Sequence, residues 1–287
     1  FSRLIIMFKY QTKSLMGARE SNEDEHDVLI NYDGSDNTKL NVNFYAVYDG
    51  HGGPLVSKFI KNRIRKYFTH KECNFNPASG NHCNGLIEYV YDLLQRKIEQ
   101  QLPAAKISGS TALSIIHYAK DGIFSQLKII NLGDCRAVVC KYNNLSQQLT
   151  KDHKPMEWDE YDRIKKMGGN VEIAAYNIPR INGLSVSRAF GDLDCKPHVS
   201  HLPEIFDHEL NVENGRISDK FLVLACDGLW DVLSNQDVIN FVLFRMSEIT
   251  HLETCDNAGK NNIALMLGKH AIEKGSEDNI SISIIFF

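Results

Sequence analysis

Two apolar runs in this chain end with an aspartate followed by a glycine: FYAVYDG over residues 44–50 and FLVLACDG over residues 221–228. Each run has the length and the apolar content of a buried strand. Asp-Gly is also a strong hairpin signal, but a helix-like segment follows each of these pairs, where a hairpin would need a second strand. The pattern therefore predicts that Asp49 and Asp227 lie at the tips of buried strands, where carboxylates can build a metal site.

Other Asp-Gly pairs have a different setting. Asp33-Gly34 lies in a polar stretch, and Asp121-Gly122 joins two strand-like runs, so we interpret both pairs as turns. A further strand end, LKIINLGDC, places Asp134 after an apolar run with the glycine in front of it. Asp134 is therefore a third candidate for a carboxylate at a strand tip.

The composition indicates a globular protein, because 43% of its 287 residues are hydrophobic. Nothing marks a domain boundary, so we expect one domain over residues 1–287, with a flap-like irregular segment at about 151–200. The formal charge is −4 and the basic residues are scattered, which argues against a nucleic acid partner. No run is long enough to span a membrane, and the opening FSRLIIMF is too short for a signal peptide.

The seven cysteines are odd in number and irregularly spaced, which is typical of reduced thiols in an intracellular protein, cytoplasmic or nuclear. The segment 70–83 holds two histidines and two cysteines, and zinc is one interpretation of it. It lacks a CxxC pair and is rich in Asn, Pro, Ser and Gly, so a surface loop is favoured. We expect a monomer.

Strand signals come in clusters, separated by pairs of helix signals. This arrangement predicts an α+β fold in which sheet packs on sheet and helices lie outside.

Two local signals refine the prediction. Ser234 and Asp237 resemble a capping box at the start of a helix. The run SGSTAL lacks the GxSxG pattern of a nucleophilic serine, so Ser110 and Thr111 are predicted to be strand residues near the core. The predicted strands are 3–12, 26–32, 42–49, three or four within 111–149, 221–225 and 280–287, and the predicted helices are 54–68, 85–102, a short one ending at Gly168-Gly169, 236–249 and about 257–273.

Several acidic residues lie at element ends beside glycine or asparagine. All offer oxygen ligands and no histidine or cysteine pair accompanies them, so the expected ion is Mg²⁺ or Mn²⁺ rather than Zn²⁺. Several carboxylates in one place need cations to reduce their repulsion, and two metal ions are the simplest source of that charge. Spacing leaves open whether they converge, since each alone is typical of a solvated surface acid. The residues are Glu23, Asp24, Asp49, Asp134, Asp227, Asp231 and Asp278.

Eight short motifs carry a resemblance to a known family. In content and order they resemble the motif series of the metal-dependent protein phosphatases, the PPM or type 2C serine/threonine phosphatases, over residues 10–287. The resemblance implies a central β-sandwich of two mostly antiparallel sheets flanked by α-helix pairs, in four αββα layers. The motifs are GARESNED, VYDGHGG, SGSTAL, NLGDCRAV, TKDHKP, INGLSVSRAFGD, FLVLACDGLWDVLS and GSEDNISI.

The resemblance also implies metal ligands. Asp49 resembles the carboxylate that bridges two metal ions, and the backbone carbonyl of Gly50 resembles a further ligand to one of them. Asp227 and Asp278 resemble ligands to the other ion.

Further acidic residues resemble secondary ligands. Glu23 and Asp24 resemble the acidic pair that holds metal-bound waters or completes a coordination shell. Asp134 and Asp231 match the positions associated with a third, weaker ion in some members.

Two residues resemble groups that handle the substrate. Arg19 resembles the arginine that binds the substrate phosphate, and its guanidinium can make two parallel hydrogen bonds to phosphate oxygens. His51 resembles the general acid, whose proton assists departure of a basic alkoxide. By residue type alone, Arg19 is typical of a solvated charge and His51 of a structural or surface histidine. Arg188 either contacts substrate or buttresses the neighbouring loop.

These features predict a protein serine/threonine phosphatase that hydrolyses phosphoserine and phosphothreonine by direct attack of a water activated by two metal ions, with a third ion as an option. Its partners would be phosphorylated proteins. Two alternatives stay open: a catalytically silent family member that acts as a binding scaffold, which should have lost a metal aspartate, and a hydrolase of small phosphoesters with the same metal chemistry.

Overall fold

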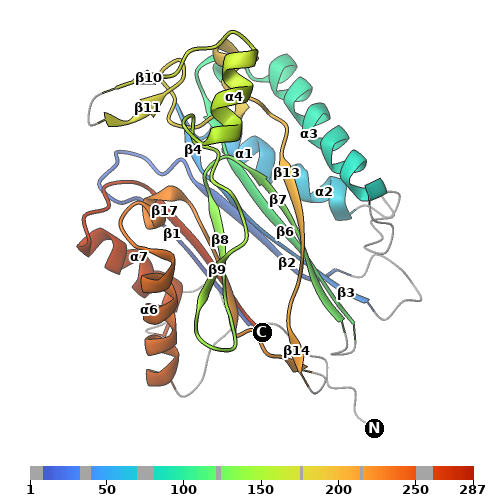
Figure 1. Ribbon diagram of the computed structural model, residues 1–287, viewed down its shortest axis with the longest axis vertical. Helices are drawn as coiled ribbons and strands as arrows, with labels where there is room; N and C mark the ends of the chain where they lie inside the picture. Colours follow the sequence, from blue (N-terminus) through green and yellow to red (C-terminus); the bar gives the residue numbers. More distant parts are fainter. Residues whose placement is uncertain are drawn as a thin grey trace.

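The central feature of the fold is a sandwich of two five-stranded antiparallel sheets (Figure 1). The structure, a computed structural model, describes residues 9–32, 40–69, 81–120, 124–174, 177–213, 216–249 and 261–287. Helices cover both outer faces, which confirms the predicted α+β sandwich in four layers. The predictions for 3–8, for the two turns at 33–34 and 121–122, for 70–80 and for 257–260 lie outside the described residues.

The first sheet has the strand order β13-β7-β6-β3-β2. Its outer face packs against three helices, α1 (Leu55–Lys61), α2 (Ile64–Thr69) and α3 (Asn81–Gln101), and buries a core that includes Phe44 and Tyr48. The strands are β2 (Glu25–Tyr32), β3 (Leu40–Tyr48), β6 (Ala112–Lys120), β7 (Phe124–Leu132) and β13 (Glu204–Glu209).

The second sheet has the order β1-β17-β16-β8-β9. Its outer face packs against α6 (Asn235–Glu248), which begins with the predicted capping box of Ser234 and Asp237, and α7 (Ile263–Glu273). None of the described helices is both long enough and apolar enough to cross a membrane. The strands are β1 (Lys9–Leu15), β8 (Arg136–Cys140), β9 (Ser146–Gln148), β16 (Phe221–Ala225) and β17 (Ile280–Phe286).

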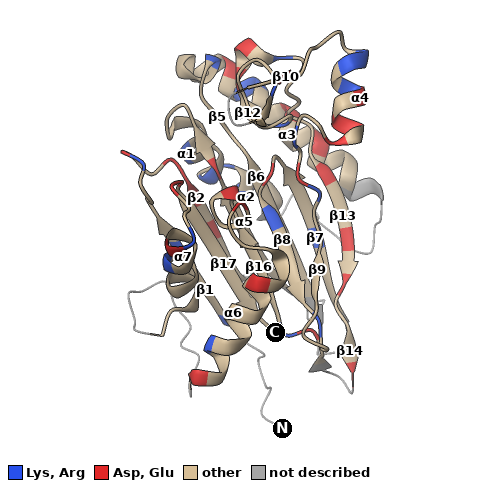
Figure 2. Cartoon of the chain, turned by 60° about the vertical axis from the view of Figure 1, so that its left-hand side comes forward, with Lys and Arg blue, Asp and Glu red and all other residues tan. Residues whose placement is uncertain are grey.

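Strand β16 shows why its sequence is apolar throughout. Side chains alternate between the two faces of a strand. Phe221 and Val223 lie in the core beneath α6 and α7, whereas Leu222 and Leu224 lie in the core between the sheets. Both faces are therefore buried, and β16 and β17 are drawn without charged residues in Figure 2.

Two predicted helix boundaries are wrong. The helix predicted at 54–68 is two helices, because α1 ends at Lys61, with Asn62 as its C-cap, and α2 begins at Ile64. Asparagine favours caps and turns over helix interiors, a signal that the apolar periodicity obscured. The helix predicted from about 257 begins instead at Ile263, where the Asn262 side chain accepts a hydrogen bond from the backbone N–H of Leu265.

The segment 151–200 lies beside α3 in Figure 1 and has a small core of its own. The predicted short helix is α4 (Trp158–Lys166). Short strands follow, namely β10 (Glu172–Ile173), β11 (Pro179–Arg180) and β12 (Phe190–Gly191), and Ile164, Ile181 and Val199 pack together beneath them. This segment is therefore a packed substructure rather than an open loop.

A buried glutamate holds this segment together. Glu160 is 2% exposed and accepts hydrogen bonds from Arg188 at 2.6 and 2.9 Å and from Arg163 at 2.8 Å. Arg188 also donates to the carbonyl of Leu202, so of its two predicted roles the structure favours buttressing. Burial opposes ionisation of Glu160, but the two arginines outweigh burial and lower its pKa to about 2.

We predict that Glu160→Gln lowers the free energy of unfolding at neutral pH by about 3 kcal/mol, because the folded state lowers the pKa of this carboxyl well below its unfolded value. This stability is present above the unfolded pKa and is lost as pH falls toward about 2. Urea unfolding between pH 7 and pH 3 measures it. The exposed Glu157→Gln is the matched control, and equal stability of the two variants would contradict the assignment.

Candidate metal centre

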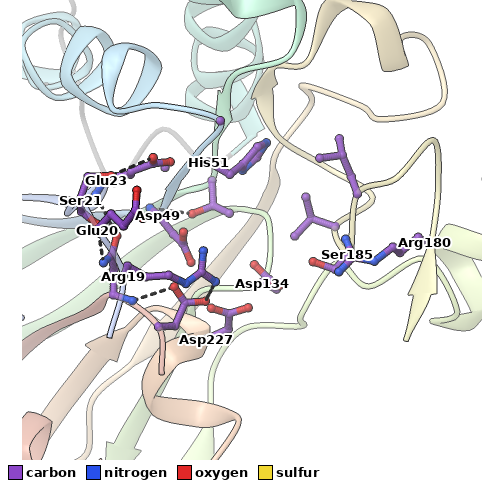
Figure 3. Close-up of a pocket in the computed structure, with 17 residues that line it drawn as sticks. Arg19, Glu20, Ser21, Glu23, Asp49, His51, Asp134, Arg180, Ser185 and Asp227 are labelled. Carbon is purple, nitrogen blue, oxygen red and sulfur yellow. Dashed lines mark hydrogen bonds and ion pairs between the residues drawn. The ribbon is translucent and has the colours of Figure 1, made fainter. Parts of the chain in front are cut away.

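The strand tips that carry the predicted carboxylates meet at one end of the sandwich. Asp49 follows β3 and Asp134 follows β7, both in the first sheet. Asp227 follows β16 and opens the short helix α5 (Asp227–Trp230), and Asp278 lies just before β17, both in the second sheet. All four line one pocket of about 500 Å³ (Figure 3). The site therefore exists only where the two sheets come together.

Two groups of possible ligand atoms share Asp49. Carboxylate oxygens of Asp49, Asp134 and Asp227 all lie within 4.8 Å of one another. Oxygens of Asp24 and Asp49 and the sulfur of Cys226 form a second group under the same limit. Asp49 thus occupies the position between two clusters that a bridging ligand would need.

Burial makes these carboxylates costly to ionise together. Burial raises the pKa of Asp49 well above its usual range, and the charges of Asp24 and Asp227 add to the rise. Burial also raises the pKa of Asp24 to about 7, although the neighbouring Ser281 and Cys226 side chains oppose part of this effect. Carboxylates this close cannot all remain charged without a compensating cation.

The donor set fits a hard divalent cation. Both carboxylate oxygens of Asp24 and Oδ1 of Asp134 are buried and have no hydrogen-bond partner within the described part of the chain. The thiol of Cys226 has two partners, since its sulfur accepts from the backbone N–H of Ser281 at 3.1 Å and donates to the carbonyl of Asn279 at 3.3 Å. The atoms left to bind an ion are therefore oxygens, the ligands that Mg²⁺ and Mn²⁺ prefer.

Lys154 supplies a cation from the chain itself, a role that was not predicted from the sequence. Its ammonium contacts Asp134 and lies 3.5 Å from Asp227. Burial opposes its charge, but the charges of Asp134 and Asp227 outweigh burial and raise the pKa of Lys154. One positive charge against several carboxylates offsets only part of their repulsion. A third ion at Asp134 would have to compete with this ammonium.

Backbone contacts fix Asp49. Its N–H donates to the hydroxyl of Thr111 at 3.0 Å, and its carbonyl accepts from the N–H of Thr111 at 2.8 Å. Gly50 follows, and a Cβ there would lie 2.3 Å from the carbonyl oxygen of Glu23, so only glycine allows this close approach. Thr111 is buried, as predicted, but its contribution to the site was not foreseen.

Asn279 connects the two ends of the chain around the site. Its side-chain oxygen accepts from the N–H of Glu23 at 2.9 Å, and its amide nitrogen donates to the carbonyls of Met16 and Ser21. This asparagine positions the loop that carries Arg19 next to Asp278. Asn279 lies within the motif GSEDNISI, but this role was not predicted from the sequence.

Arg19 lies at the rim of the pocket. Its guanidinium is 61% exposed and lies 2.8 Å from the Asp278 carboxylate. In Figure 3, Arg19 and Glu23 lie on one side of the pocket, and Arg180 and Ser185 from the segment 151–200 lie on the opposite side. The Glu23 carboxylate accepts from the backbone N–H of Gly53 at 2.9 Å.

Asp231 lies outside the ligand groups found among the described residues. It is exposed, it caps the end of α5, and its backbone N–H donates to the carbonyl of Asp227 at 2.8 Å. Burial raises the pKa of Asp227 and the charge of Asp231 adds to the rise, so Asp231 is near the site. Its predicted role at a third ion stays a prediction.

His51 forms part of the pocket wall and has an acidic partner. It belongs to the two-residue strand β4 (Gly50–His51), and its Nε2 lies 2.8 and 2.9 Å from the two carboxylate oxygens of Asp192. Burial lowers the pKa of His51, but the hydrogen bond and charge of Asp192 outweigh burial and raise it. Asp192 was not among the residues predicted from the sequence.

A cluster of buried and half-buried carboxylates between two antiparallel sheets, with a histidine and an arginine beside it, matches the resemblance found in the sequence. A family model described as protein phosphatase 2C covers residues 8–280. The chain belongs to this family. Members of the protein phosphatase 2C family are metal-dependent serine/threonine phosphatases, and this chain is an enzyme of that class.

Similar proteins come from distant sources. A PP2C-like domain-containing protein of Acanthamoeba polyphaga mimivirus is 43% identical over 175 residues, which cover 56% of this chain and 94% of that protein. Human protein phosphatase 1A is 32% identical over 296 residues, covering 97% of this chain and 70% of that protein.

Solved structures share the fold. A Caenorhabditis elegans sex determining protein superimposes with a TM-score of 0.77 at 26% identity, over 97% of this chain and 64% of that chain. A serine-threonine phosphatase 2C from Toxoplasma gondii superimposes with a TM-score of 0.73 at 22% identity, over 98% of this chain and 95% of that chain.

We predict that Mn²⁺ raises the melting temperature of the protein by about 5 °C at a concentration 100 times its dissociation constant, because it binds the folded state. Without metal, Asp49→Asn should melt no lower than the unchanged protein, since it removes a carboxyl group that neighbouring carboxylates repel when it is charged. With Mn²⁺, Asp49→Asn should melt at a lower temperature than the unchanged protein. Differential scanning calorimetry measures both states, with the exposed Asp194→Asn as control. If Mn²⁺ raised the melting temperature of Asp49→Asn as much as that of the unchanged protein, the assignment of Asp49 to the metal site would be contradicted.

Proposed function

We propose that this chain hydrolyses phosphoserine and phosphothreonine in proteins by direct attack of water on phosphorus, without a covalent enzyme intermediate. The observation that supports this most is the group of Asp49, Asp134 and Asp227 oxygens within 4.8 Å, at a pocket whose lining includes His51 and Arg19. Bound Mg²⁺ or Mn²⁺ would lower the pKa of a water molecule and so supply the nucleophile.

Asp49, Gly50, Asp227 and Asp278 would hold the two ions. Glu23 and Asp24 would hold their waters or complete a coordination shell, and Asp134 would contribute to a third ion only in competition with Lys154. The paired placement of Asp49 between two groups of donors supports its assignment as the shared ligand.

Arg19 would bind the substrate phosphate. Its side chain is mostly exposed and its partner Asp278 is 40% exposed, so the guanidinium can turn toward a phosphate at little cost in buried contacts. A planar guanidinium can bind two phosphate oxygens at once, which fixes the phosphoryl group as well as attracting it.

His51 would act as general acid rather than as a base for a side-chain nucleophile. Its Nε2 is bonded to Asp192, and within the described part of the chain no serine or threonine hydroxyl is bonded to the ring. The serine or threonine alkoxide that leaves is strongly basic, so a proton donated as the bond breaks would accelerate the reaction by about 10²–10⁴-fold.

Two other functions were open from the sequence. A silent scaffold is disfavoured, because Asp49, Asp227 and Asp278 are all present and line the same pocket. A hydrolase of small phosphoesters would use the same chemistry and is an outcome of the assays below. The monomeric state, the intracellular location and the absence of nucleic acid and membrane partners stay predictions.

The chain should release phosphate from a phosphothreonine peptide with Mn²⁺ or Mg²⁺. Activity should fall to background with a chelator and in Asp227→Asn, because each removes what positions and activates the water. Malachite green detection of phosphate measures this, with Asp194→Asn as control. Activity that survives both treatments would overturn the proposal, and activity on small phosphoesters alone would favour the other hydrolase.

His51→Gln should discriminate between leaving groups. With a phosphothreonine peptide we expect kcat to fall by about 10²-fold or more, since the alkoxide needs a proton. With 4-nitrophenyl phosphate, whose phenolate leaves without one, the loss should be much smaller. Steady-state kinetics on both substrates test this, and equal losses would argue against the general acid.

A further inference from the structure

A small sheet brings His51 and Asp192 together from distant parts of the chain. Its strand order is β12-β5-β4, with β5 (Gly109–Ser110) in the middle. Gly109 pairs with His51 on one side and with Gly191 on the other, and Asp192 comes directly after Gly191. The two side chains therefore meet across a glycine.

Gly109 leaves the space in which they meet. A Cβ at this position would lie 2.1 Å from Oδ2 of Asp192 and 2.5 Å from Nε2 of His51. Any side chain there would force the carboxylate and the ring apart. The contact between His51 and Asp192 is thus built into the backbone of the middle strand.

Asp192 itself is held in a specific conformation. Its backbone has a φ of 48°, in the left-handed region that most residues avoid, and its side chain is 1% exposed. Its N–H donates to the carbonyl of Ser108 at 3.1 Å, and the N–H of Gly191 donates to the buried side chain of Gln95 at 3.0 Å. A buried carboxylate is costly unless it is paired, and both of its oxygens lie within 3 Å of the same ring nitrogen.

We propose that Asp192 is a positioning residue for the reaction, which holds the His51 ring by Nε2–H so that Nδ1 is the nitrogen that delivers the proton. This inference rests on the proposed function. Nδ1 has no hydrogen-bond partner within the described part of the chain, and the ring lines the pocket. The carboxylate fixes both the orientation of the ring and the nitrogen that keeps its hydrogen when the other gives one up.

In this proposal His51 gives up one proton for each alcohol released. The bond between phosphorus and the serine or threonine oxygen breaks, and its electron pair stays on that oxygen. The oxygen takes the proton from Nδ1 and leaves as the alcohol. The ring remains neutral, with Nε2–H still donated to Asp192, and regains a proton at Nδ1 from solvent before the next turnover.

A merely structural role would give a different result. If Asp192 only fastened the turn after β12, its replacement would lower stability or slow every substrate alike. If it acts through His51, the loss must depend on the leaving group, because only basic leaving groups need the proton.

The test is Asp192→Asn, which keeps the size of the side chain and tolerates the left-handed backbone. With a phosphothreonine peptide and Mn²⁺, kcat should fall by about 10-fold to 10²-fold with KM nearly unchanged. With 4-nitrophenyl phosphate, the fall should be less than about 3-fold. Asp194→Asn, two residues away and exposed, is the matched control. Equal losses on both substrates would overturn the proposal.

A double-mutant cycle gives a second measurement. If Asp192 acts through His51, adding Asp192→Asn to His51→Gln should slow the peptide reaction no further. Additive losses would overturn the positioning role. Failure of the underlying function is recognisable separately, because His51→Gln alone would then show no dependence on the leaving group. If the loss in His51→Gln depends on the leaving group and the loss in Asp192→Asn does not, the positioning role of Asp192 is contradicted and the general-acid role of His51 still holds.

Discussion

Repulsion between closely spaced carboxylates is the constraint around which this structure is organised. Asp49, Asp134 and Asp227 bring their oxygens within 4.8 Å of one another, and Asp24 adds a fourth carboxylate beside Asp49. Such a cluster is stable only where other interactions hold it together and where cations reduce the repulsion. Lys154 provides one positive charge. Both oxygens of Asp24 and Oδ1 of Asp134, which have no hydrogen-bond partner among the described residues, mark where more is needed.

The sandwich supplies the rigidity. Three apolar cores lie between the layers, and the strands that end in Asp49 and Asp227 contribute to the one between the sheets. Because these aspartates come from different sheets, the geometry of the site depends on how the sheets pack. Thr111 and Asn279 then fix the backbone at each tip by hydrogen bonds from neighbouring segments.

The sequence predicts those parts of the site that are encoded locally. Asp49 and Asp227 were recognised because an apolar strand and a glycine surround each of them, and the motif order indicated the family. Asp192 and Asn279 could not be assigned a role in this way, since their partners lie 141 and 256 residues away and only the folded chain brings them close. Lys154 lay within a recognised motif, but the sign of its charge alone did not show which carboxylates it meets. The break at Asn62 was lost because the apolar periodicity continues through it.

The proposed metal site depends most on Asp49, which would be shared between two ions. Crystals grown with Mn²⁺ and measured near the manganese absorption edge test it most directly. We predict two anomalous difference peaks at this end of the sandwich, both within bonding distance of Asp49 and one of them bonded to Asp227. A map in which no peak touches Asp49 or Asp227, at Mn²⁺ concentrations that support phosphate release, would contradict the account.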